Sequence, residues 1–156
     1  MAIYPHNNLL GCRTIQDWTI VKREMPQLFN DRNSLNAQRR EEVIYFALQK
    51  SALFHVCVVS YRGQYRLLRG TQELQALMDF ILCGAPLMRD TWTLPMPFPV
   101  EEAKCTYSGL SMQARERLLA VKIPHCDISV STAQEMEYLC ARYSDGISDS
   151  ISLPML

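Results

Sequence analysis

The sequence lacks several features that assign a protein to a class at once. Its 156 residues include 16 Lys and Arg and 16 Asp and Glu, so no net charge of either sign attracts nucleic acid or an acidic surface. No two of its six cysteines form a C-x-x-C pair, which excludes the common zinc-finger spacings. No apolar run approaches the length of a membrane span, and no G-x-S-x-G, H-E-x-x-H or Walker sequence is present.

These absences set the first expectations. The length fits one domain over residues 1–156, with enough chain to bury a core without metal or disulfides. The opening "MAIYPHNNLL" has no basic segment followed by a long apolar run, as a signal peptide would. We therefore expect a cytoplasmic protein that contacts no membrane, with six reduced cysteines and no bound metal.

Apolar periodicity predicts the secondary structure. Helical spacing covers residues 16–29, 35–50, 71–83, 112–122 and 132–143, and Thr132 and Glu135 form a capping-box pattern. The run "LFHVCVVS" predicts a buried strand, paired as a hairpin over residues 54–60 and 64–68, and residues 123–131 predict another strand. The proline-rich residues 85–111 predict a long loop with short strands around Trp92 and Phe98. The fold class is α+β, a small mixed sheet flanked by helices.

The segment "RGTQE" lies where the hairpin's second strand turns into a helix. A glycine followed by a helix N-terminus presents free backbone N–H groups, which is a common way to bind phosphate. Arg69 and Glu73 stand at the two ends of this segment. Two interpretations are open: the pair stabilises the first helical turn, or the turn binds an anion.

The order of these pieces resembles the ParB-like nuclease superfamily. The similarity is to the branch found in modification-dependent restriction subunits, whose fold is shared with sulfiredoxin. It rests on a helix with "QRREEVIYFAL", followed by an apolar strand, a hairpin, a glycine turn and the helix "LQALMDFI". The resemblance covers about residues 15–146. It implies a ParB/sulfiredoxin-like fold, and phosphodiester or nucleotide chemistry at the glycine turn.

The family motif at that turn reads Asp-Gly-Gln-Gln-Arg, and this sequence departs from it. Gly70 and Gln72 match, whereas Arg69 replaces the acid and Glu73 replaces the base. A guanidinium accepts no proton and binds no metal, and a carboxylate repels phosphate, so we expect no catalytic residues here. The resemblance implies that a remnant phosphate or nucleotide site is kept at the turn. A nucleotide is the one possible ligand, and we expect no other cofactor. The residues of this remnant site are Gln38, Arg39, Arg40, Arg69, Gly70, Thr71 and Gln72.

Three functions follow as hypotheses. The first is a stand-alone, catalytically degenerate ParB-like module of phage or mobile-element origin, which binds a protein or nucleic-acid partner in the host cytoplasm for host takeover, anti-restriction or assembly. The family's larger members continue into a separate nuclease domain, and we expect none here. The second is an active nucleotide-dependent nuclease or NTP hydrolase. The third is a structural component of an assembled particle or homo-oligomer, suggested by the apolar tail "ISLPML".

Overall fold

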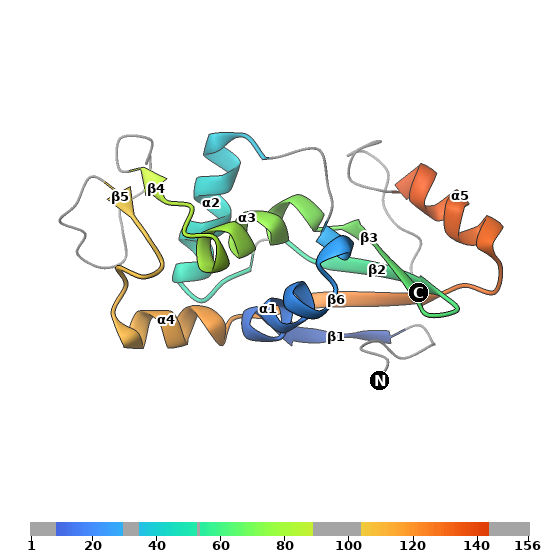
Figure 1. Ribbon diagram of the computed structural model, residues 1–156, viewed down its shortest axis with the longest axis horizontal. Helices are drawn as coiled ribbons and strands as arrows, with labels where there is room; N and C mark the ends of the chain where they lie inside the picture. The colour runs from blue at the N-terminus through green and yellow to red at the C-terminus, as the bar shows by residue number, and fades with distance from the viewer. Residues whose placement is uncertain (1–8, 30–34, 53, 89–103, 144–156) are drawn as a thin grey trace.

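The computed structural model describes residues 9–29, 35–52, 54–88 and 104–143. Its centre is a four-stranded mixed sheet in the order β1 (Leu9–Thr14), β6 (Lys122–Ser129), β2 (Val56–Tyr61) and β3 (Gln64–Arg69). Strands β2 and β6 run parallel, and the two outer pairings are antiparallel. A two-stranded ribbon of β4 (Leu87–Met88) and β5 (Lys104–Cys105) lies at the opposite end of the molecule from α5 (Figure 1).

Helices cover both faces of the sheet. They are α1 (Ile15–Glu24), followed by a 3-10 turn (Pro26–Phe29), then α2 (Ala37–Leu48), α3 (Thr71–Leu82), α4 (Met112–Leu119) and α5 (Ala133–Tyr143). The expected α+β class with a small mixed sheet is therefore confirmed. None of the helices in the described ranges is long and apolar enough to cross a membrane.

Short polar residues start most of these helices. The Thr14 hydroxyl accepts from the Asp17 backbone N–H at 3.1 Å while the Asp17 carboxylate accepts from the Thr14 N–H at 3.0 Å, a full capping box. Asn36, Ser111 and Thr132 each accept from the backbone N–H three residues on, at the starts of α2, α4 and α5. Only Gly70, before α3, starts one of these helices without a side-chain cap.

The two faces of the sheet carry separate apolar clusters. The first face, which includes Val56, Val58 and Ile123, belongs to a large cluster with residues of α1, α2, α3 and α4. The second face includes Cys57, Val59 and Ile128. These residues form a smaller cluster with Leu68 of β3 and with Met136 of α5. Alternate residues of β2 therefore supply two different cores.

The predicted hairpin and the helix after it are confirmed, with ends shifted by a residue or two. The helix expected over residues 16–29 begins one residue earlier and ends at Glu24, because Pro26 lacks an N–H and a 3-10 turn follows. Strand β1 was not predicted, because its six residues include Gly11 and show little alternation. The predicted strands around Trp92 and Phe98, and the apolar tail, lie outside the described residues.

Candidate functional site

The turn between β3 and α3 requires glycine. Gly70 has a left-handed backbone with φ of 78° and is buried. A Cβ at this position would collide with the carbonyl oxygen of His55, which precedes β2. The chain at Gly70 therefore packs directly against the neighbouring strand, and the first turn of α3 starts there, where the Gly70 carbonyl accepts from the Leu74 N–H at 2.9 Å.

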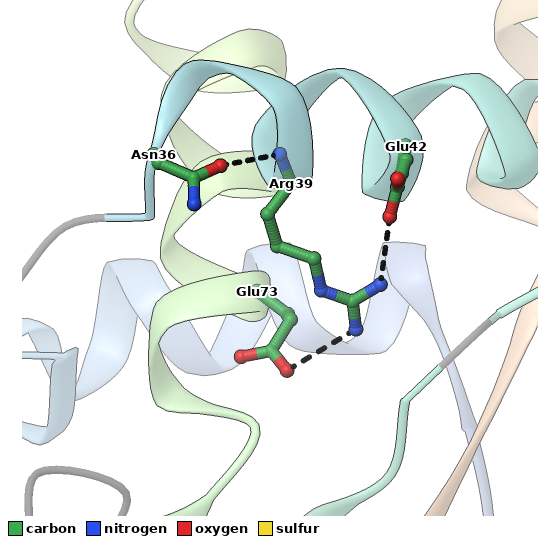
Figure 2. A network of polar contacts seen from close by, with 4 residues as sticks. All are labelled: Asn36, Arg39, Glu42 and Glu73. Atoms are coloured by element: carbon green, nitrogen blue, oxygen red, sulfur yellow. Dashed lines mark hydrogen bonds and ion pairs between the residues drawn. The ribbon is translucent and has the colours of Figure 1, made fainter.

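The start of α2 meets the first turn of α3, as Figure 2 shows. Asn36 caps α2 by accepting from the Arg39 backbone N–H at 2.8 Å. The Arg39 guanidinium then lies between two carboxylates, 3.5 Å from Glu42 Oε2 on its own helix and 3.6 Å from Glu73 Oε2 on α3. The predicted Gln-Arg element and the predicted glycine turn are thus neighbours in space.

The charges at this contact do not favour an anion. One guanidinium faces two carboxylates, so the group as a whole is acidic. A phosphate that approached Arg39 would compete with Glu73, which already forms an ion pair with the guanidinium, and would be repelled by that carboxylate. The backbone N–H groups at the start of α3 attract anions, but Glu73 lies in the same first turn and its carboxylate opposes the binding of a second anion there.

Arg40 is used elsewhere. Its guanidinium donates to the carbonyl oxygens of Pro86 at 2.9 Å and Ala85 at 3.2 Å, and so joins α2 to the segment that follows α3. Burial lowers the pKa of Arg40 from its usual value, and the nearby carboxylate of Asp79 opposes part of this change. Arg40 therefore holds backbone carbonyls at the far end of α3 from the glycine turn.

The remaining predicted residues are dispersed around the turn. Arg69 ends β3 opposite Cys57, and its charge opposes part of the rise that burial causes in the pKa of the Cys57 thiol. Thr71 is buried, Gln72 is half-buried and Gln38 is exposed near the start of α2. Of the three residues predicted on α2, Arg39 is thus the one that the described contacts bring to the first turn of α3.

A second polar cluster lies on β1 and β6. Asp127 is only 2% exposed, and its Oδ2 lies 3.8 Å from both Arg13 Nη2 and His125 Nε2. Neither carboxylate oxygen accepts a hydrogen bond from the described residues. Burial raises the pKa of Asp127 to about 6, although Arg13 opposes the rise, while burial and then Arg13 lower the pKa of His125.

Sequence reasoning missed this cluster, although a signal was present. His125 and Asp127 are two residues apart in a strand, and such residues share a face. Gly11 lies opposite His125 and makes room for it, because a Cβ there would stand 3.2 Å from His125 Cε1. The cluster is a buried carboxyl that gains or loses a proton near pH 6 beside an imidazole, which is a pattern shared by functional sites and by structural ion pairs.

Comparison of the chain with protein-family models, with curated proteins and with solved structures found no match. The resemblance to the ParB-like superfamily therefore stays an inference from the residues quoted above. Within the described ranges, no group of three or more His, Cys, Asp and Glu side chains is placed to hold a metal ion.

Proposed function

We propose that this chain is a binding module with a ParB/sulfiredoxin-like fold, whose nucleotide-processing turn no longer carries out chemistry. Three features support this proposal: a hairpin of β2 and β3, a left-handed glycine directly after β3, and α3 starting at that glycine. These are the elements on which the resemblance rests. The module acts by binding a partner.

A single observation carries the proposal, namely the position of Arg39 between Glu42 and Glu73. In the family that the sequence resembles, the position of Glu73 holds an arginine that neutralises phosphate. Here a carboxylate occupies that position and already pairs with Arg39 at 3.6 Å. The ion pair stabilises contact between α2 and α3 at the expense of anion binding.

The charge distribution favours a protein as the partner. Basic and acidic residues balance over the whole chain, so there is no general attraction for a nucleic-acid backbone. Arg39 faces two carboxylates and Arg40 faces two backbone carbonyls, so neither extends a basic surface. A phage or mobile-element protein of this type acts as a host-takeover or anti-restriction factor, or joins an assembly.

The test of the inactive turn uses nucleotides. Thermal-shift and hydrolysis assays with ATP, GTP and CTP, each with Mg²⁺, are expected to show neither a shift nor turnover for the unmodified protein. Glu73→Arg is expected to gain nucleotide binding, because it removes a repelling carboxylate and adds a donor with fork geometry. Glu116→Arg makes the same charge change at an exposed position of α4 and is expected to gain none.

Two results would overturn the proposal. The first is Mg²⁺-dependent hydrolysis by the unmodified protein that Arg69→Ala abolishes, which would make the chain an enzyme. The second concerns the partner. Affinity capture from the native host, repeated after nuclease treatment and at high salt, is expected to retain a protein; capture that nuclease removes would assign a nucleic-acid partner instead.

A further inference from the structure

Two cysteines from distant parts of the sequence lie side by side in the sheet. Cys57 of β2 and Cys126 of β6 are direct partners in the register of the two parallel strands. Neighbouring strands are about 4.8 Å apart. That spacing falls within the range of about 4.4–6.8 Å between Cα atoms that a disulfide tolerates. Cys57 is a buried member of the apolar cluster of the second face, and Cys126 packs against that cluster.

The two thiols already interact in the reduced protein. All six cysteines are free thiols in the structure, and the Cys57 and Cys126 side chains are hydrogen-bonded to each other. This contact opposes the rise that burial causes in the pKa of Cys126 and adds to the rise in the pKa of Cys57. Cys57 is fully buried, whereas Cys126 is half-buried. The pair is therefore asymmetric, with Cys126 the more accessible sulfur.

We propose that Cys57 and Cys126 are a reversible redox pair, which forms a disulfide between β2 and β6 when the protein meets a peroxide. The Cys126 thiol gives its proton to water, and the resulting thiolate attacks one peroxide oxygen. The O–O bond breaks, and a sulfenic acid and a hydroxide result; the hydroxide takes up the released proton as water. The Cys57 sulfur then attacks the Cys126 sulfur, the S–S bond forms, and the S–O bond breaks. The departing hydroxide takes the Cys57 proton and leaves as water, so one peroxide is reduced for each disulfide.

The disulfide would join the two central strands of the sheet. It closes a loop that includes β3, α3 and α4, and so constrains the unfolded chain far more than a bond between close residues would. The oxidised protein is therefore expected to melt several degrees higher than the reduced protein. A thiol reductant restores the original melting temperature.

Peptide mapping after hydrogen peroxide treatment tests the assignment. Protein is oxidised, alkylated under denaturing conditions and cut with trypsin, and then with a protease that cleaves after Glu. The second cut is needed because one tryptic peptide, residues 123–142, holds both Cys126 and Cys140. The expected product joins the peptide of residues 51–62 to the Cys126 fragment, with loss of both thiols from alkylation. Cys105, buried in the cluster of the first face, is the internal control and is expected to stay alkylated.

Single variants separate the two roles. Cys126→Ser is expected to abolish the linked peptide and the rise in melting temperature. Cys57→Ala is expected to leave a Cys126 sulfenic acid that dimedone traps, a product that a merely structural cysteine would not give. Cys83→Ser, at an exposed position, is expected to change neither. A linkage from either cysteine to Cys140, or full alkylation of Cys57 and Cys126 after peroxide has oxidised the exposed thiols, would overturn the proposal.

Discussion

The two faces of the sheet are covered very differently. Among the described residues, the cluster of the first face has 21 buried members, drawn from α1 to α4, the 3-10 turn, the strands and the segments between them. The cluster of the second face has five, and α5 is the helix that packs there against β2 and β3. Figure 1 shows α5 at one end of the sheet, whereas α2, α3 and α4 lie toward the other end.

The difference shows how one sheet supports two kinds of structure. The first face buries whole aromatic rings, such as Trp18 and Phe80, and holds most of the apolar area removed from water. The second face is closed by a helix whose described residues are mostly exposed, with Met136 its buried member. The first face is therefore expected to determine global stability, and α5 to open locally at lower cost.

The largest expected effect is on the first face, at Phe80. Its side chain is fully buried and its ring meets Tyr107 edge-on, with centroids 6.3 Å apart. Phe80→Ala removes this ring from a tightly packed cluster and is expected to lower the free energy of unfolding by about 3–5 kcal/mol. Denaturant titration followed by circular dichroism measures it.

Met136→Ala is the matched change on the second face. Met136 is buried on α5 against a small cluster, so we expect a loss near the lower end of the usual range, about 2 kcal/mol. Amide exchange in α5 is expected to accelerate while exchange in α3 does not. An equal loss of stability in both variants would remove the distinction between the faces.

Gly70→Ala tests the junction that feeds α3 onto the first face. The added Cβ meets the His55 carbonyl, and the left-handed φ of 78° strains any other residue. We expect a cost of about 2–3 kcal/mol. Gly63 is a suitable control, because it has the same φ of 78° but open space around it, so Gly63→Ala carries the backbone strain without the collision. Equal costs at the two positions would show that the collision is relieved.

Much of the fold was predictable from local patterns. The apolar residues that predicted α2 and α3 are buried in the cluster of the first face. They are Val43, Ile44 and Leu48 on α2, and Leu74 and Leu77 on α3. They were visible in the sequence because a helix with one buried side repeats every three to four residues. Strand β1 shows no such pattern in the sequence. It is a strand because it pairs with β6, which lies more than a hundred residues further along the chain.

The candidate site was predictable only in part, for a related reason. The glycine turn has a local signature, and Gly70 is where it was expected. The partner of Glu73 is different, because Arg39 comes from another helix and only the packing of α2 on α3 brings it there. The contacts of Arg40 with Ala85 and Pro86, and that of Asp127 with Arg13, likewise join segments that no local pattern relates.

Asp127 places a carboxyl group in β6 and gives a pH-dependent prediction. Its pKa is about 6 in the folded protein against 3.8 ordinarily, so the folded state holds the proton more tightly than the unfolded state. The contribution of Asp127 to the free energy of unfolding is therefore most favourable below about pH 4 and is lost as the pH rises to about 6. Asp127→Asn removes this loss, and we expect it to be more stable than the unmodified protein by about 2 kcal/mol above pH 7.

Unfolding measured from pH 4 to pH 8 checks this sign. The gain of Asp127→Asn is expected to shrink as the pH falls below 6, because protonated Asp127 resembles Asn. The lowered pKa of His125 acts in the opposite direction, since a neutral buried imidazole favours the folded state as the pH rises. His125→Gln separates the two contributions. The difference in free energy of unfolding between Asp127→Asn and the unmodified protein is compared at pH 4 and pH 8. If this difference is less favourable to the variant at pH 8 than at pH 4, the ion pair with Arg13 outweighs the cost of burying the carboxylate.

The smallest expected effect is at Arg39, on the rim of the first face. Its pairs with Glu42 and Glu73 are partly exposed, and solvent and salt screen such pairs. Arg39→Ala is expected to cost less than about 1 kcal/mol, and a double-mutant cycle with Glu73→Ala to give a coupling that salt reduces. The Asn36 cap is kept, because it uses the backbone N–H of residue 39.

Arg40→Ala is the adjacent control, and its outcome decides how the two arginines differ. Arg40 donates to two backbone carbonyls, of Ala85 and Pro86, that follow α3. Removing it leaves both acceptors without this donor, and the expected cost is about 1–3 kcal/mol with little dependence on salt, since carbonyls carry no net charge. A salt-dependent loss at Arg39 equal to the loss at Arg40 would make the Arg39 ion pairs the stronger link between α2 and α3. In that case the inverted charge of Glu73 would be explained by stability alone.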